Sequence, residues 1–165
     1  MYITIFVEGN ESLFLQKLIL QTVPELTEEE VRITKNIEKP EVSTHRINIF
    51  EAGGFTSLHL LKPNFEKTIA YGGVNLVIFD ADDVSKEYGG YETRRIYLEE
   101  TKTKNKLEFG MFLFPDNHND GDYETLLESI IVEDHQSVID CFHGYQSCIS
   151  GKNRSYNIPG NKEKM

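Results

Sequence analysis

Residues 74–83 have the sequence VNLVIFDADD, an apolar run that ends in three acids within four residues. Because its first six residues are apolar almost without alternation, the run predicts a buried strand of a parallel sheet. Open α/β sheets bind their ligands at the carboxyl ends of the strands, which is where the acids fall. Asp80 and Asp82 carry the oxygen ligands that a hard cation takes. The alternative is a solvated turn rich in aspartate.

Two other segments follow the same pattern. Residues 2–7 (YITIFV) form an apolar run that ends at Glu8, and residues 109–114 (FGMFLF) form another that ends just before Asp116. The carboxyl ends of parallel strands lie at the same edge of a sheet, so Glu8 and Asp116 are expected to lie close to Asp80 and Asp82. Three strands that each end in an acid are a stronger indication of a site than one Asp-x-Asp motif.

The order of the patterns along the chain predicts an α/β fold with a mainly parallel central sheet of about four strands flanked by helices. We expect a single domain over residues 1–149. Residues 150–165 are polar with a net charge of +3, which predicts a flexible tail.

The composition limits the classes of function. The net charge of −10 argues against nucleic-acid binding through bulk charge alone, although bound divalent cations would neutralise part of an acidic site. The densest positive charge lies in residues 91–106, where Arg94 and Arg95 are predicted to contact a phosphate backbone; the alternative is a solvated helix face. No apolar run is long enough to span a membrane and no signal-peptide pattern opens the chain, so no membrane association and a cytoplasmic location are expected.

The two cysteines, Cys141 and Cys148, lie seven residues apart in a predicted helix. That spacing corresponds to roughly 10 Å along a helix axis, which is too far for a disulfide and predicts reduced, buried thiols. A zinc site with His135 and His143 is the alternative, but the spacing lacks a Cys-x-x-Cys pair.

Several of these acidic segments resemble motifs of the Toprim domain family. Residues 5–9 (IFVEG) resemble the first-strand glutamate motif of that family, and residues 79–82 (FDAD) resemble its Asp-x-Asp motif. Residues 114–117 (FPDN) and 121–124 (GDYE) resemble the later acidic motif of the OLD-type nuclease branch. The stretch from about residue 2 to 132 is similar to a small bacterial Toprim-like family of uncharacterised function.

The resemblance implies a three-layer Toprim-like fold and a role for each matching acid. Glu8 would be a metal ligand or general acid/base, and Asp80 and Asp82 would be metal ligands. Glu124, together with Asp122, would be an accessory acid. The implied cofactor is Mg²⁺ or Mn²⁺, and the loop acids Asp116 and Asp122 are candidates for a second metal position.

The leading hypothesis is therefore a metal-dependent nuclease that cleaves nucleic-acid phosphodiesters with Glu8, Asp80, Asp82 and Glu124 as catalytic residues. A nucleic-acid partner follows from it, and a homodimer and a partner protein that supplies targeting are further expectations. OLD-type proteins carry an ATPase domain that this sequence lacks, which is why a targeting partner is expected.

Two alternatives stay open. Residues 78–82 (IFDAD) also resemble the nucleophile strand of HAD-type phosphatases, with Asp80 as the nucleophile. That motif usually opens the chain, and the expected later GDxxxD motif is missing because residue 126 is leucine. The other alternative is a non-catalytic module that binds a metal, a nucleotide or a partner protein, which the small size and acidic surface favour.

Overall fold

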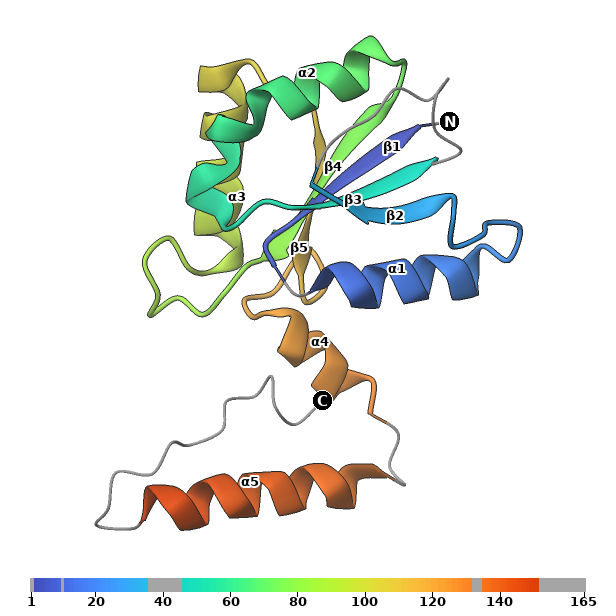
Figure 1. The fold of residues 1–165 in the computed structure, drawn as a ribbon. Helices are drawn as coiled ribbons and strands as arrows, with labels where there is room; N and C mark the ends of the chain where they lie inside the picture. The colour runs from blue at the N-terminus through green and yellow to red at the C-terminus, as the bar shows by residue number, and fades with distance from the viewer. Residues whose placement is uncertain (1, 10, 36–45, 132–134, 152–165) are drawn as a thin grey trace. The chain divides into compact units, whose positions relative to one another are not determined.

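The computed structural model describes residues 2–9, 11–35, 46–131 and 135–151 (Figure 1). The chain divides into two compact units, Met1–Tyr123 and Glu124–Met165, and each is described by itself. The single domain expected over residues 1–149 stays a prediction. Of the predicted flexible tail, residues 152–165 lie outside the described residues.

The first unit alternates strands with helices along the chain. Its elements are β1 (Ile3–Val7), α1 (Glu11–Thr22), β2 (Val31–Thr34), β3 (Ile47–Glu51), the 3₁₀ helix η1 (Phe55–Leu61), α2 (Lys62–Ala70), β4 (Val74–Asp80), α3 (Tyr91–Asn105) and β5 (Gly110–Phe114). Helix α4 (Tyr123–Ser129) begins at the boundary between the units, and α5 (Gln136–Ser150) follows it.

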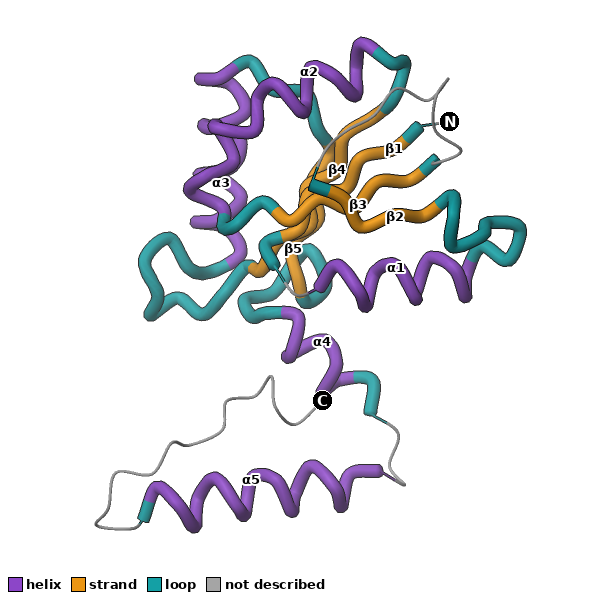
Figure 2. The backbone as a smooth tube through the Cα atoms, in the orientation of Figure 1, coloured by secondary structure: helices purple, strands orange, loops and turns teal. Residues whose placement is uncertain are grey.

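The five strands that the structure describes form one sheet in the order β2-β3-β1-β4-β5 (Figure 2), and the register of every neighbouring pair is parallel. The predicted α/β class with a parallel sheet is confirmed, whereas the predicted number of about four strands is corrected to five. Short β2 has only four residues and follows a highly charged segment, so its sequence pattern is weak. Val7 pairs with Ile78 and Phe114 pairs with Asp80, so β1, β4 and β5 end at the same edge.

Alternation along the strands sends the side chains to two separate cores. Phe6, Val77 and Phe79 point to the face that η1, α2 and α3 cover, where Leu58, Phe65 and Leu98 complete the cluster. Ile5, Val7 and Ile49 point to the opposite face and pack with Leu15 of α1. Figure 1 shows α1 on one side of the sheet and α2 and α3 on the other, which makes three layers.

In the second unit, α5 has Ile139 as its buried residue. Cys141 and Cys148 are free and exposed, so the prediction of buried thiols is wrong: this helix does not bury the stripe on which they lie. In the part of the chain that the structure describes, no helix has the length and apolar character needed to cross a membrane.

Candidate functional site

The carboxyl edge of the sheet carries three of the predicted acids. Glu8 directly follows β1, Asp80 is the last residue of β4, and Asp82 lies two residues further on. Because β1 and β4 are neighbouring parallel strands, their register brings Glu8 and Asp80 to the same edge, as the sequence predicted. Their side chains make different contacts, however. Glu8 and Asp82 turn toward α3, whereas Asp80 accepts a hydrogen bond from the Tyr123 amide at 2.9 Å.

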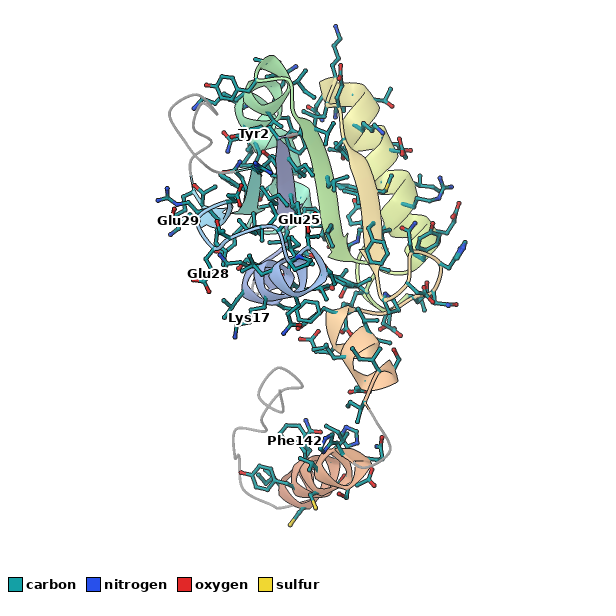
Figure 3. The ribbon with its side chains drawn as sticks, turned by 90° about the vertical axis from the view of Figure 1, so that its right-hand side faces the viewer. Tyr2, Lys17, Glu25, Glu28, Glu29 and Phe142 are labelled. Carbon is teal, nitrogen blue, oxygen red and sulfur yellow. The ribbon has the colours of Figure 1, made fainter. Side chains whose placement is uncertain are left out.

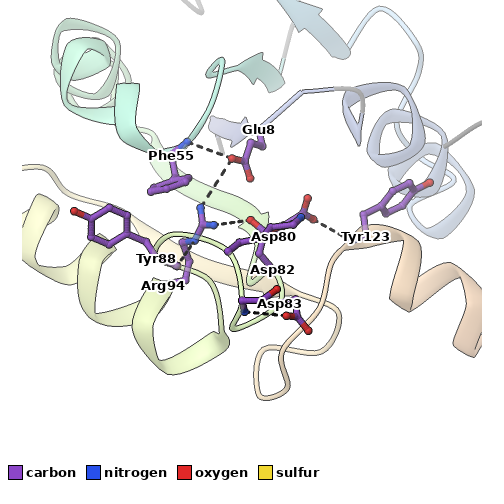
Figure 4. Close-up of polar contacts among 10 residues, drawn as sticks. Glu8, Phe55, Asp80, Asp82, Asp83, Tyr88, Arg94 and Tyr123 are labelled. Atoms are coloured by element: carbon purple, nitrogen blue, oxygen red, sulfur yellow. Dashed lines mark hydrogen bonds and ion pairs between the residues drawn. The ribbon is translucent and has the colours of Figure 1, made fainter. Parts of the chain in front are cut away.

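Arg94 is the centre of the charged network on the α3 side. Its side chain is fully buried, and its Nη2 donates to Oδ2 of Asp82 at 2.6 Å. Its Nη1 lies 4.0 Å from Oε1 of Glu8, and its Nε donates to the Tyr88 carbonyl at 3.2 Å. The guanidinium also stacks on Phe55, with its central carbon 3.5 Å from the ring centroid. Figure 4 shows the guanidinium with the two aromatic residues, Phe55 and Tyr88, on one side and the acidic residues on the other.

Asp82 is held by its backbone as well as by its side chain. Its φ of +63° lies in the left-handed region, which aspartate tolerates better than most residues. Asp82 and Gly121 exchange backbone hydrogen bonds, which ties the loop after β4 to the loop after β5. Lys86 forms a second ion pair with the carboxylate at 2.5 Å. Asp82 is therefore compensated by two cations.

The carboxylate of Glu8 has a hydrogen-bond partner for only one of its two oxygens among the described residues. Its Oε1 accepts a hydrogen bond from the Phe55 amide at 3.4 Å, but Oε2 is buried and has no hydrogen-bond partner among the described residues. Burial raises the pKa of Glu8; Arg94 lowers it, Asp82 raises it, and the amides of Asp80 and Phe55 lower it. The net effect is a raised pKa, because the nearby positive charge does not offset the loss of water.

The negative charge of the Asp80 carboxylate has even less compensation from nearby positive charge. Burial raises the pKa of this carboxyl to about 7; the Tyr123 amide lowers it, and the carboxylates of Glu11, Glu8 and Asp82 raise it further. No ion pair joins Asp80 to a cation within the described residues. Glu8 and Asp80 thus repel each other's negative charge in a partly buried place, an arrangement that a bound cation would relieve.

The remaining predicted site residues lie elsewhere or have other partners. Asp116 is exposed and closes its own loop by accepting hydrogen bonds from His118 and Asn119, which lower its pKa. Asp122 lies in the first unit, near the end of the loop after β5, and Glu124 begins the second unit. Arg95 is partly exposed and pairs with Glu92 at 2.6 Å.

The described residues contain no group of three or more His, Cys, Asp or Glu side chains placed to hold a metal ion, and this holds for the alternative zinc set too. Of the predicted ligands at this edge, Asp82 already forms ion pairs with Arg94 and Lys86. Mg²⁺, however, needs only one or two protein carboxylates because it retains water molecules and also binds substrate phosphates. Glu8, with its unpartnered oxygen, and Asp80, with no cation beside it, are the residues that fit such an ion.

The sequence did not predict that Arg94 is a buried cation paired with Asp82. It predicted a surface residue that contacts phosphate. One signal could have revealed it: Arg94 lies four residues before Leu98, so the two share a helix face, and both are fully buried. The contribution of Phe55 had no comparable signal, because it depends on the packing of η1 against α3.

No protein-family model, no curated protein and no solved structure matches this chain. The Toprim-like family therefore stays a prediction that rests on the motifs.

Proposed function

We propose that Glu8 and Asp80 bind Mg²⁺ or Mn²⁺ and that the protein is a metal-dependent nuclease. The observation that carries the proposal is the pair of poorly compensated carboxyls: Oε2 of Glu8 is buried without a hydrogen-bond partner among the described residues, and the pKa of Asp80 is raised to about 7. The Toprim-like motifs support phosphodiester chemistry at this place. Bound there, the cation would polarise a phosphodiester and stabilise its attacking and leaving oxygens.

The chain's own residues would contribute binding and charge. Glu8 and Asp80 hold the cation, while Asp82 orients the guanidinium of Arg94 through a short ion pair. Nη1 of Arg94 is buried, lies 4.0 Å from Oε1 of Glu8 and has no hydrogen-bond partner among the described residues, so Arg94 would contribute a positive charge near the cation that favours an anionic phosphate. A nucleic-acid substrate, a cytoplasmic location, a targeting partner and a homodimer all belong to this proposal.

Metal binding is tested first, because it does not require the substrate. Isothermal titration calorimetry with Mg²⁺ and Mn²⁺ should show binding to the wild-type protein and a loss of at least tenfold in affinity for Asp80→Asn and for Glu8→Gln. Asp116→Asn is the matched control, since Asp116 is exposed and bonded within its own loop. Equal metal binding by all four proteins, or no binding by the wild type, would contradict the proposed metal site.

Cleavage is tested separately with single-stranded and double-stranded DNA and RNA in Mn²⁺, Mg²⁺ or EDTA. We expect metal-dependent cleavage that Asp80→Asn abolishes and Asp116→Asn retains. Intact substrates in every reaction would contradict the nuclease function. Hydrolysis of p-nitrophenyl phosphate that depends on Asp80, without cleavage of nucleic acid, would instead identify the phosphatase alternative.

One observation favours the second candidate function, a non-catalytic binding module. Asp82 is already neutralised by Arg94 and Lys86, so the acidic edge is partly compensated within the chain itself. Metal or nucleotide binding without turnover of any of these substrates would support the module.

A further inference from the structure

A pocket lies between η1 and the C-terminal half of α3. Its volume is about 350 Å³. Its walls combine the rings of Tyr97 and His59 with hydrogen-bonding and charged groups. Among the other lining residues are Thr56, Glu100, Thr101 and Lys104. The nuclease chemistry proposed above uses none of these side chains.

Three aromatic rings connect this pocket to the acids. Phe55, Tyr88 and Tyr97 form an aromatic cluster in which the Tyr88 and Tyr97 centroids are 4.9 Å apart and those of Phe55 and Tyr97 are 5.2 Å apart. Tyr88 is 44% exposed, so the cluster is open to the solvent. Phe55 stacks directly on Arg94, which binds Asp82, and Tyr97 lines the pocket. The contacts therefore run without a break from the pocket to the acidic edge.

The distance along α3 suits a short stretch of nucleic acid. Arg94 and Thr101 are seven residues apart on this helix, which corresponds to roughly 10 Å at 1.5 Å per residue. At about 3.4 Å per nucleotide in a stacked strand, that distance is covered by about three nucleotides. A strand with a phosphodiester at the acids can therefore place a base in the pocket.

We propose that the aromatic cluster and its pocket bind unpaired bases, so that the protein acts on single-stranded nucleic acid. This inference rests on the proposed nuclease function and names its substrate class. Stacking on aromatic rings tolerates any base and adds affinity that does not come from positive charge, which matters for a chain of net charge −10. The bases of a duplex are already stacked and paired and cannot enter such a pocket. Lys104, which has no ion-pair partner among the described residues, supplies a cation for a neighbouring phosphate.

The test is binding without cleavage. Fluorescence anisotropy of labelled single-stranded oligonucleotides in EDTA and low salt should show tighter binding than a blunt duplex of the same sequence. An oligonucleotide with abasic sites in place of three central bases should bind the wild-type protein about 5- to 150-fold more weakly, the range expected for the loss of one stacked base or more. This arm needs no protein variant, so it does not depend on a variant folding.

Variants then locate the site. Tyr97→Leu should weaken binding over the same range, whereas Tyr97→Phe should retain it because the ring remains. Lys104→Gln should weaken binding and flatten the salt dependence by about one phosphate contact. Lys17→Gln makes the same charge change on α1, where Lys17 points away from the sheet (Figure 3), and should bind like the wild type.

The outcomes separate this inference from the nuclease proposal. Single-strand binding that depends on Tyr97, without cleavage in the presence of any metal, would support the base-binding surface and contradict the nuclease proposal. Cleavage with equal binding of duplex, abasic and single-stranded probes would keep the nuclease and overturn the base-binding surface. Binding that is unchanged in Tyr97→Leu would also overturn it.

Discussion

Asp80→Asn should make the metal-free protein more stable, and the gain should depend on pH. Burial raises the pKa of Asp80 from 3.8 to about 7, so the folded state holds its proton more tightly than the unfolded state does. The stability of the wild type therefore falls as pH rises from about 4 to 7 and is constant above that range. Asparagine has a similar shape, can still accept the Tyr123 hydrogen bond and carries no charge, so the variant lacks this loss.

The magnitude follows from the shift. A rise from 3.8 to about 7 is about three units, which corresponds to an upper limit of about 4 kcal/mol at about 1.36 kcal/mol per unit. Two of those units lie between pH 5 and pH 7. The stability advantage of Asp80→Asn over the wild type should accordingly grow by about 2.7 kcal/mol between pH 5 and pH 8.

The assay is urea unfolding in EDTA at the two pH values, followed by far-UV circular dichroism because the chain has no tryptophan. Mg²⁺ at about 100 times its Kd should restore about 2.7 kcal/mol to the wild type at pH 8 and much less to the variant. Asp116→Asn is the control and should show no gain, since hydrogen bonds lower the pKa of that exposed group. If the advantage of Asp80→Asn is the same at pH 5 and pH 8, the carboxylate is not an uncompensated buried charge and the reasoning fails.

Three further predictions concern the stability of the fold in the same urea assay. Arg94→Gln should cost about 3–5 kcal/mol because it removes a fully buried guanidinium and leaves the partly buried carboxylate of Asp82 without that cation. Loss of the exposed Lys86 in Lys86→Gln should cost at most about 1 kcal/mol, and equal costs for the two variants would contradict a buried pair. Phe65→Ala should cost about 3–5 kcal/mol, since this buried ring stacks on Phe6 with centroids 4.0 Å apart, and a cost below 1 kcal/mol would contradict the packing. Gly73→Ala should destabilise by about 1–3 kcal/mol because its Cβ would lie 2.6 Å from the Tyr2 carbonyl oxygen; a neutral result would show that this strand end can shift.

The strands and their common edge were predictable because burial leaves a direct mark on the sequence. β4 packs side chains into the hydrophobic clusters on both faces of the sheet and therefore has a nearly continuous apolar run, so the acids that end it are easy to recognise. The parallel order of β1 and β4 then brings Glu8 and Asp80 to one edge. For β2, with its four residues, the local pattern was too short to count firmly as a strand.

The partners of the acids were not predictable in the same way. Which carboxylate meets a cation depends on the face to which each side chain turns after the strand ends, and the left-handed Asp82 breaks the strand alternation there. The sequence treated Asp80 and Asp82 as equivalent ligands, while the structure pairs only Asp82 with Arg94. Likewise, Asp116 belongs to the same pattern of strand-end acids, but its side chain accepts hydrogen bonds from amides of its own loop. Aspartate often makes such local hydrogen bonds in turns.

The backbone bridge between Asp82 and Gly121 has a consequence for how this scaffold can be redesigned. In most α/β proteins the loops at the carboxyl edge are separate modules that can be lengthened or exchanged one at a time. Here two hydrogen bonds join the loop after β4 to the loop after β5. A graft into either loop must therefore preserve the geometry of the other, and the two are best transplanted together as one inseparable unit.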